Sequence, residues 1–459
     1  MKRPSISLSI CTGILLLTLA VECAAQSAAV DFSQLEKTAL AEMKQHHVPG
    51  LAIAVIRGES VIFAKGLGVA SVETGAPVTP DMLFRLGSTT KMFTCAAAIS
   101  LVEEGKLAVD KPVNRYVKGL NSKVGKLTLH QLMTHTSGLH DESPMFGLHD
   151  DTALRDGIMK WNESWFFTEP DKIYSYANPG FWLTGLAIET VDGKFYADSL
   201  NERLFKPLGM GRTMLRPILA MTYPLAIGHG VEEGEAKVIR PLGDNAGTWP
   251  AGQIFSSAND LSRFVIAFMN DGKLEGKQVL SPSMIKTIST PYADIPGSET
   301  RYGYGLQLGT VRGVRLAQHS GSRAGYGSYI RMAPEQRFGV ILLMNLTGAA
   351  LPRTVDKAME LALNLPPREE VKTKAPVDMS REEMGKYVGV YRNGDSREEL
   401  LIKDGKLVLK RGGRESAVVK LDEQHFKAGS TNGEFVLVFG PNGRAEYIFA
   451  GGRALSRQK

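Results

Sequence analysis

Residues 88–102 have the sequence STTKMFTCAAAISLV, and this stretch decides the fold. From Met92 to Val102 nearly every position is apolar, so a helix formed here has no polar face. A helix that is hydrophobic all round belongs in the interior of a domain. Two glutamates and Gly105 follow, and glycine is the residue type that most often stands just past a helix C-terminus. We therefore predict a buried central helix that ends near Gly105 and carries Ser88 at its start.

The first turn of this helix pairs a hydroxyl with an amine. Ser88 and Lys91 lie three residues apart and therefore share one helix face. A lysine removed from water has a lowered pKa, so its neutral amine can take the proton of a serine nucleophile. The backbone N–H of Ser88, at the helix N-terminus, would face a developing oxyanion. The same spacing recurs at 283–286 and 456–459, where no buried helix follows, so the context favours Ser88.

Two further short motifs lie later in the chain. Tyr176-Ala177-Asn178 supplies a phenol and a carboxamide, although residues 391–393 repeat the pattern in a β-rich tail. His319-Ser320-Gly321-Ser322 occurs once, on an expected strand that is followed by a glycine-rich turn at 324–327. Together with Ser88 and Lys91, these motifs form the candidate site.

Other chemistries lack their motifs. The chain has no Gly-x-Ser-x-Gly elbow, Walker A loop, His-Glu-x-x-His or paired Cys-x-x-Cys. His135 and His140 lie near several acidic residues, but their spacing fits no standard metal-ligand pattern, so we expect no metal and no cofactor. The formal net charge is +6 without a Lys/Arg run, which does not indicate a nucleic-acid partner.

Taken in order, the motifs resemble those of the serine β-lactamase and penicillin-binding-protein superfamily. The closer match is the branch that contains class C β-lactamases, D-alanyl-D-alanine carboxypeptidases, D-aminopeptidases and related esterases. LMTHTSGL at 132–139 and AGQIFSSA at 251–258 are similar to further landmarks of that branch. The resemblance spans roughly residues 31–365 and rests on five ordered landmarks.

The resemblance implies a role for each motif residue. Ser88 is implied to be the nucleophile that forms an acyl-enzyme, Lys91 its proton acceptor, and Tyr176 the relay of a proton to the leaving group. Which of Lys91 and Tyr176 is the acylation base stays open. Asn178 and the 319–322 strand (His319, Ser320, Gly321 and Ser322) are implied to bind substrate. The N–H groups of Ser88 and Ser322 are implied to form the oxyanion hole.

One departure from the family pattern concerns position 319. Most members with strong β-lactamase activity carry Lys where this chain has His319. Lysine is a permanent cation for a substrate carboxylate, whereas histidine is largely neutral at pH 7. This difference favours amide or ester substrates over penicillins. Arg323 is either a replacement charge or a solvated loop residue.

The predicted fold class is α+β, as the resemblance implies. One antiparallel sheet is expected between helices, with an all-helical lobe inserted after the Ser88 helix and the active site at their junction. The sequence itself predicts a helix that ends near His46, a hairpin over 51–56 and 60–64, and a helix over 355–363. Short β-type runs with turn signals between them lie at 304–308, 315–318, 328–332 and 339–344.

The two ends of the chain differ from the middle. Lys2 and Arg3 precede an apolar run and small residues, the pattern of a secretory signal peptide over 1–25, so we expect a secreted or periplasmic protein with no integral membrane span after cleavage. A polar, proline-rich linker is expected over 366–380 and a small all-β domain over 381–459, which resembles the lipocalin-like barrel of some family members. That barrel either shapes the cleft or serves stability alone.

The function predicted from these features is hydrolysis of a peptide, amide or ester through a Ser88 acyl-enzyme. Short peptides with D-residues are the first expected substrates, and a true β-lactamase or a carboxylesterase is the alternative. A catalytically silent sensor that binds peptidoglycan fragments is the non-enzyme alternative. The expected partner is a small-molecule or short-peptide substrate, and the sequence does not define an oligomeric state.

Overall fold

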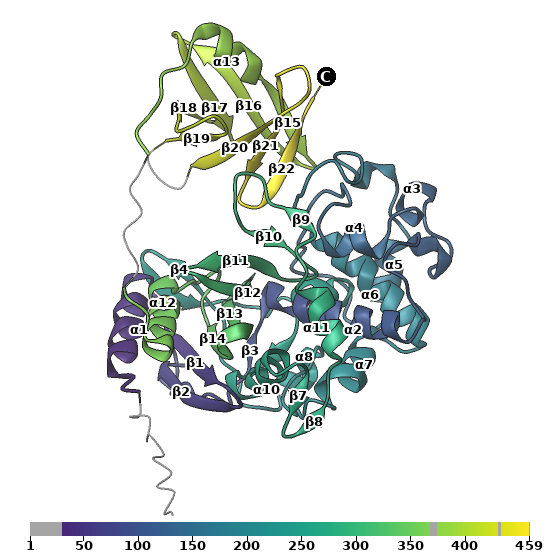
Figure 1. Cartoon of the computed structure of the whole chain (residues 1–459), viewed down its shortest axis with the longest axis vertical. Helices are drawn as coiled ribbons and strands as arrows, with labels where there is room; N and C mark the ends of the chain where they lie inside the picture. Colours follow the sequence, from purple (N-terminus) through teal and green to yellow (C-terminus); the bar gives the residue numbers. More distant parts are fainter. Residues whose placement is uncertain (1–29, 368–373, 430–432, 459) are drawn as a thin grey trace, which may run out of the picture. The chain divides into compact units, whose positions relative to one another are not determined.

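An eight-stranded antiparallel sheet forms the centre of the larger, N-terminal part of the chain (Figure 1). The computed structural model describes residues 30–367, 374–429 and 433–458. The strands run in the order β2-β1-β14-β13-β12-β11-β10-β9. Their bounds are β1 Gly50–Arg57, β2 Ser60–Gly68, β9 Ala293–Asp294, β10 Arg301–Tyr302, β11 Gln307–Val311, β12 Val314–Arg323, β13 Tyr326–Ala333 and β14 Phe338–Met344.

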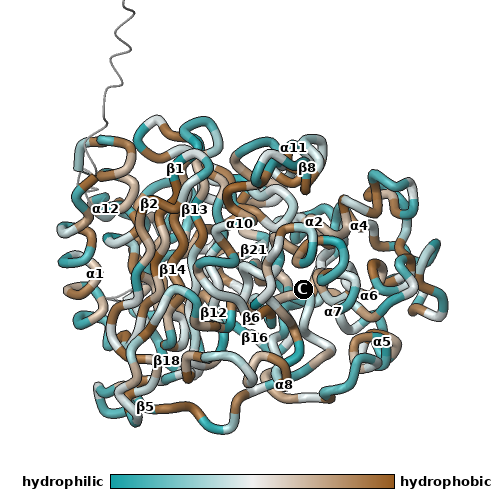
Figure 2. The backbone as a smooth tube through the Cα atoms, turned by 90° about the horizontal axis from the view of Figure 1, so that it is seen from below, coloured by the Kyte–Doolittle hydropathy of each residue, from teal (hydrophilic) through white to brown (hydrophobic). Residues whose placement is uncertain are grey.

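Helices cover both faces of this sheet, and the alternation of side chains along β1 explains why. Ala52, Ala54 and Ile56 point into the cluster formed with α2 (Thr90–Glu103) and α10 (Ala258–Met269). Leu51, Ile53 and Val55 point into a second cluster with α1 (Ser33–Gln45) and α12 (Pro352–Leu363). A strand with both faces buried is apolar throughout, as FGVILLM in β14 is (Figure 2).

The helical lobe lies between α2 and β4 along the chain and packs around α2. Its helices are α3 Ser122–Gly125, α4 Leu129–Met133, α5 Ala153–Ile158, α6 Asn178–Asp192 and α7 Tyr196–Leu200. The remaining short elements are α8 Pro217–Ala220, α9 Trp249–Gly252, α11 Pro282–Ile288, and the two-stranded pairs β3 Phe84–Arg85 with β6 Phe255–Ser256, β4 His229–Glu232 with β5 Glu235–Val238, and β7 Lys273–Leu274 with β8 Lys277–Gln278. Helix α2 is buried as expected, with Lys91 fully enclosed and Cys95 a buried free thiol.

The C-terminal segment closes into an eight-stranded barrel with its own core. Its strands are β15 Gly389–Asn393, β16 Ser396–Lys403, β17 Lys406–Arg411, β18 Arg414–Lys420, β19 His425–Ala428, β20 Glu434–Phe439, β21 Ala445–Ala450 and β22 Arg453–Arg457. Helix α13 (Arg381–Tyr387) adds Met384 and Tyr387 to the barrel core. The predicted fold class, with the all-β barrel, is confirmed.

Some predicted boundaries differ from the structure. The run 304–308 is not one strand, because Gly305 (φ +70°) lies in a turn between β10 and β11. The run 315–318 extends to Arg323, so the whole third motif lies on β12.

Residues 32–459 cluster as one compact unit, so the domain division at 366–380 stays a prediction. The predicted signal peptide lies outside the described residues. Within the described part of the chain, no helix combines the length and apolarity that crossing a membrane requires.

Candidate active site

Ser88 lies in a single 3-10 turn, Gly87–Thr89, that joins β3 to the buried helix α2. Gly87 has a φ of +58°, a conformation that glycine adopts without a steric penalty. Its surroundings also exclude a side chain, because a Cβ there would lie 2.6 Å from the backbone nitrogen of Ser322. Ser88 is only half-buried, so its hydroxyl stands at the accessible end of an otherwise enclosed helix.

Strand β12 lies directly against this turn. A Cβ on Gly321 would come 1.9 Å from the carbonyl oxygen of Leu86 and 3.0 Å from the backbone nitrogen of Ser88. Such distances are possible only between backbones in close contact. The main chains of Ser88 and Ser322 are therefore neighbours, which is the arrangement that a two-donor oxyanion hole needs.

Lys91 lies one helical turn after Ser88 and is fully buried. Its Nζ is 3.2 Å from Ser88 Oγ, 2.7 Å from Asn178 Oδ1 and 2.7 Å from the carbonyl oxygen of Ala251. The rings of Tyr176 and Phe181 enclose it, with centroids 4.8 and 5.2 Å from Nζ. The amine thus has three oxygen partners and no access to bulk water.

This environment determines the protonation of Lys91. Burial lowers the pKa of Lys91 to about 7, while Asp141 raises it and Arg453 lowers it by smaller amounts. A neutral amine has two N–H groups and one lone pair. The oxygens of Asn178 and Ala251 can only accept, so they take both N–H groups and leave the lone pair directed at the Ser88 hydroxyl. In the protonated form the third N–H serves Ser88 Oγ, and the same geometry therefore fits both states.

Tyr176 brings a second proton-carrying group to Ser88. Burial raises the pKa of its phenol well above the usual value, and the neighbouring Ser88 hydroxyl opposes that rise. The hydroxyl is therefore protonated at neutral pH. Its oxygen is buried and makes no well-aligned hydrogen bond among the described residues. An unsatisfied buried hydroxyl beside a serine is typical of a site that receives a ligand.

Asn178, the first residue of α6, is fixed by an acidic side chain. Asp141 Oδ1 accepts from the Asn178 backbone N–H at 2.7 Å and from its Nδ2 at 2.9 Å. The other Asp141 oxygen accepts from Arg453, with Oδ2 2.7 Å from Nε and 2.5 Å from Nη2. A chain of hydrogen bonds thus runs from Arg453 on β22 through Asp141 and Asn178 to Lys91.

The turn between β21 and β22 contacts the site in other ways. The Tyr176 N–H donates to the carbonyl oxygen of Gly452 at 2.9 Å, and the Arg453 guanidinium carbon lies 5.2 Å from the Tyr176 ring centroid. The backbone N–H of Ala454 donates to Ser175 Oγ at 3.1 Å. Tyr176 is therefore fixed at two places: its ring contacts the Lys91 amine, and its backbone is hydrogen-bonded to the barrel.

His319 is buried and belongs to a directional hydrogen-bond chain. The Ala177 N–H donates to His135 Nδ1 at 3.0 Å, so a neutral His135 carries its proton on Nε2, which faces the Tyr302 hydroxyl at 3.3 Å. Tyr302 in turn donates to His319 Nε2 at 3.0 Å, which leaves His319 Nδ1–H to donate to the carbonyl oxygen of Ser320 at 2.6 Å. Burial keeps both imidazoles neutral, since it lowers the pKa of His319 to about 3 and that of His135 well below its usual value.

The structure therefore places the predicted site residues in two groups. Ser88, Lys91, Tyr176 and Asn178 have their side chains together. From β12, Gly321 and Ser322 contribute backbone, Ser320 and Ser322 have exposed side chains, and His319 lies behind Tyr176 with ring centroids 6.3 Å apart. Arg323 is bound to a loop, donating to Ser143 Oγ and to the carbonyl oxygen of Pro144, both at 2.8 Å.

Sequence reasoning missed Asp141 and Arg453. Asp141 is one of the acidic residues near His135 and His140, whose spacing fits no metal-ligand pattern. In the described ranges, no group of three or more His, Cys, Asp or Glu side chains is placed to hold a metal ion. Arg453 is 312 residues away from Asp141 along the chain and belongs to no motif, so nothing in the sequence pairs them. Of the repeated patterns, Tyr391 is buried in the barrel core, where it donates to the carbonyl oxygen of Tyr387.

Comparison with known proteins places this geometry in a family. The family model described as Beta-lactamase matches residues 34–364. Penicillin-binding protein 4 of Amycolatopsis lactamdurans is 30% identical over 315 residues, which are 66% of this chain and 82% of that protein. Protein flp of Staphylococcus aureus (strain N315) is 24% identical over 331 residues, 70% of this chain and 65% of that protein. Unguisins hydrolase ungD' of Aspergillus campestris (strain IBT 28561) is 28% identical over 361 residues, 72% of this chain and 66% of that protein.

Two solved structures are similar to this chain over more of its length than the family model is. SurE has a TM-score of 0.77 at 23% identity and covers 93% of this chain and 98% of its own. The octameric penicillin-binding protein homologue from Pyrococcus abyssi has a TM-score of 0.64 at 26% identity and covers 93% of this chain and 100% of its own. Since the family match covers most of the chain and the 30%-identical relative is matched over most of its length, the chain belongs to the beta-lactamase family of serine hydrolases.

Proposed function

We propose that this chain hydrolyses amide or ester bonds of small substrates through an acyl-enzyme on Ser88, with short peptides containing D-residues as the preferred class. The single observation that carries the proposal is the buried Lys91 amine, with a pKa near 7 and 3.2 Å from Ser88 Oγ. A general base works best when its pKa lies near the working pH.

Acylation would use the groups in sequence. Neutral Lys91 takes the Ser88 proton while Oγ attacks the substrate carbonyl carbon. The N–H groups of Ser88 and Ser322 stabilise the oxyanion, a contribution of about 3 kcal/mol per donor in other enzymes. As the bond to the leaving group breaks, the Tyr176 hydroxyl donates a proton to the leaving nitrogen or oxygen and regains one from protonated Lys91. Water then attacks the ester carbonyl while neutral Lys91 takes one of its protons, and Lys91 returns that proton to Ser88 Oγ as the carboxylic acid product is released.

This scheme assigns the acylation base to Lys91 and the proton donor to Tyr176. The support is the opposite direction of their pKa shifts, since burial lowers the pKa of Lys91 and raises that of Tyr176. A pair of titratable groups with diverging pKa values is a common division between base and acid. Asn178 Oδ1 would accept a hydrogen bond from the Lys91 amine, and an N–H of Asn178 Nδ2 would donate one to the substrate.

The substrate class follows from what β12 lacks. A neutral His319 offers no cation to a substrate carboxylate, and Arg323 is occupied by the loop at Ser143 and Pro144. Peptides and esters that are recognised by their carbonyl and amide groups suit this strand better than penicillins do. One relative is named a hydrolase, which supports hydrolysis in general, and SurE has been solved with D-Leu, which supports substrates that contain D-residues. True β-lactamase activity is the second candidate, supported by the family membership.

A substrate panel tests the proposal. Steady-state turnover is measured for D-alanine p-nitroanilide, a p-nitrophenyl ester and nitrocefin with the wild-type chain and with Ser88→Ala. We expect turnover of the anilide and the ester, weak or no turnover of nitrocefin, and loss of all turnover in Ser88→Ala. Nitrocefin as the best substrate would favour the β-lactamase. Folded protein without turnover of any of them would favour the silent binding protein.

Export by residues 1–25 is part of the proposal and is tested by the N-terminal sequence of the protein recovered from the periplasm or medium.

A further inference from the structure

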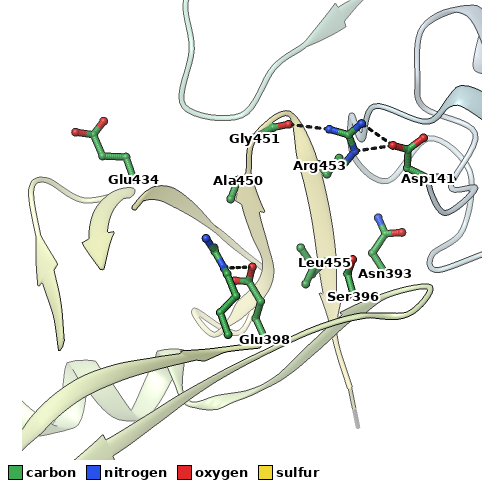
Figure 3. A pocket seen from close by; sticks show the side chains of 10 residues that line it. Asp141, Asn393, Ser396, Glu398, Glu434, Ala450, Gly451, Arg453 and Leu455 are labelled. Carbon is green, nitrogen blue, oxygen red and sulfur yellow. Dashed lines mark hydrogen bonds and ion pairs between the residues drawn. The ribbon is translucent and has the colours of Figure 1, made fainter. Parts of the chain in front are cut away.

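Tyr176 lies in a segment without helix or strand, residues 173–177, directly before α6. Its hydroxyl is buried and makes no well-aligned hydrogen bond among the described residues. The position of the phenol therefore depends on the contacts of its ring and of the backbone around it. One backbone contact comes from the barrel, where the Tyr176 N–H donates to the carbonyl oxygen of Gly452 at 2.9 Å. Figure 3 shows Arg453, the residue after Gly452, bound to Asp141, which fixes this turn.

His135 contacts the residues on both sides of Tyr176. Its carbonyl oxygen accepts from the Ser175 N–H at 2.9 Å, and its Nδ1 accepts from the Ala177 N–H at 3.0 Å. The imidazole also lies against the phenol, with ring centroids 4.2 Å apart and an angle of 31° between the ring planes. The backbone, the side-chain nitrogen and the ring of one residue therefore hold three consecutive residues in place.

The backbone of His135 has an unusual conformation. Its φ is +61°, in the left-handed region that few residues other than glycine adopt, and the residue is 1% exposed. The turn around it keeps this conformation, because the Thr134 N–H donates to the carbonyl oxygen of His130 at 3.0 Å. The Thr136 N–H donates to the carbonyl oxygen of Gln131, also at 3.0 Å. Non-glycine residues in this region cost about 1–3 kcal/mol and gather at functional sites, which points to a role for His135 beyond packing.

The imidazole is fixed as firmly as the backbone. Its Nε2 faces the Tyr302 hydroxyl at 3.3 Å, and the rings of Tyr302 and Phe181 have centroids 4.8 and 5.2 Å from its own. Burial lowers the pKa of His135 well below its usual value, so Nδ1 keeps its lone pair for the Ala177 N–H. Asparagine would supply an acceptor but no ring, and phenylalanine a ring but no acceptor. Histidine supplies both.

We propose that His135 is a positioning residue for Tyr176, and that its hold on this tyrosine determines how well the site cleaves amides relative to activated esters. The inference rests on the proposed function, in which the Tyr176 hydroxyl gives its proton to the leaving group. An amide nitrogen must receive that proton as its bond to the acyl carbon breaks, whereas p-nitrophenolate leaves as a stable anion. A displaced phenol should therefore slow amide cleavage and affect activated esters much less.

The experiment compares D-alanine p-nitroanilide with D-alanine p-nitrophenyl ester, which share one acyl group. The ratio of their kcat/KM values does not depend on the fraction of folded enzyme, so a loss of stability alone does not change it. Tyr176→Phe removes the proton donor and should raise the ester-to-anilide ratio by about 100-fold. His135→Gln lacks an acceptor at the Nδ1 position and should raise the ratio by about tenfold, because the phenol is no longer held in place.

Two further variants at position 135 separate its contacts. His135→Asn places Oδ1 where Nδ1 was and tolerates the same backbone conformation, so its ratio should rise less than that of His135→Gln. His135→Gly adopts a φ of +61° freely and should raise the ratio even if His135→Gln does not fold. The matched control is His130→Gln, since His130 Nδ1 lies 2.8 Å from the Tyr304 hydroxyl and its ring packs against Tyr292 and Tyr304. Its ratio should equal that of the wild type.

The double variant His135→Gln/Tyr176→Phe should have the same ratio as Tyr176→Phe alone, because His135 acts through this tyrosine. A further rise in the double variant would contradict that route. Ratios in His135→Gln and His135→Gly no higher than in His130→Gln would overturn the inference, as would an equal rise in His135→Asn. If Tyr176→Phe leaves the ratio unchanged, the proton donor of the proposed function is wrong and the inference fails with it. A rise in Tyr176→Phe without one in His135→Gln or His135→Gly contradicts the positioning role alone.

Discussion

Lys91 combines full burial with a position 3.2 Å from a serine hydroxyl. A buried lysine is costly when charged, and here Asn178 and Ala251 offset part of that cost with two acceptors. The arrangement stabilises an amine that is half-protonated near pH 7. Reactivity and stability are therefore linked through one proton.

The rate of acylation should depend on this proton. Because the neutral form of Lys91 is the base, kcat/KM is expected to rise with pH and level off, with a midpoint near the pKa of about 7. His319, whose pKa is about 3, should add no second limb between pH 5 and 8. The measurement is kcat/KM for an activated ester from pH 5 to 9.5. A flat profile, or a midpoint near the usual lysine value, would show that Lys91 is not the base.

Stability should respond to the same proton in a defined direction. The pKa of Lys91 is lower in the folded state than in the unfolded state, so between about pH 7 and 10.5 only the unfolded chain is protonated. In this window, protonation of Lys91 stabilises the unfolded chain. Raising the pH removes this stabilisation of the unfolded chain, so the fold becomes more stable. Relative to Lys91→Met, the wild-type free energy of unfolding should increase by up to about 4 kcal/mol from pH 6 to pH 10. Denaturant unfolding at both pH values measures the difference, and a pH-independent difference contradicts the pKa shift.

At the scale of elements, a tyrosine connects the helical lobe to the sheet. Tyr302 on β10 bridges His135, which precedes α6, and His319 on β12. Tyr302→Phe leaves two buried imidazole nitrogens without a partner and should destabilise the fold by about 1–3 kcal/mol. Equilibrium denaturation measures this loss, with Tyr223→Phe as a control because Tyr223 is exposed. A loss no larger than the control's would argue against the directional chain.

The contact between β12 and the Ser88 turn should be intolerant of a methyl group. In Gly321→Ala the added Cβ would meet the Leu86 carbonyl oxygen at 1.9 Å, so the strand must move away from Ser88. We expect kcat/KM to fall by about 100-fold, since displacements near 1 Å have effects of this size. Gly230→Ala on β4, where the atom nearest to the added Cβ would be Ile239 Cδ1 at 3.5 Å, should retain activity. Full activity in Gly321→Ala would mean that this close approach does not position the oxyanion hole.

Sequence patterns predicted elements well where one strong signal was enough. The all-apolar run of α2 and the hairpin of β1 and β2 reflect local rules. Of the motif residues, Lys91, Tyr176 and Asn178 have their side chains near Ser88, and the roles assigned to them stay predictions. Strand β12 contacts Leu86 and the Ser88 turn, and the turn at Gly305 contacts α2; no local pattern encodes such tertiary contacts. Arg453 and Asp141 were missed for the same reason, since their pairing exists only once the barrel is in place.

At the scale of the whole molecule, the barrel is joined to the site by Arg453. This guanidinium lowers the pKa of Lys91 and, through Asp141, fixes Asn178. Arg453→Gln should therefore lower kcat/KM by about tenfold, through a less ordered Asn178, and move the pH midpoint upward. Arg414→Gln is the matched control, because Arg414 is exposed on the same barrel and far from the motif residues in sequence. An unchanged pH profile in Arg453→Gln would favour a barrel that serves stability alone.

The central claim is that the Ser88 hydroxyl becomes a nucleophile because the Lys91 amine takes its proton. Intact-mass spectrometry after brief incubation with a fluorophosphonate tests it most directly, at pH 6 and pH 8. The account predicts one adduct per chain, formed faster at pH 8, and none in Ser88→Ala or, over the same time, in Lys91→Met. Equal labelling of the wild type and Ser88→Ala would contradict it.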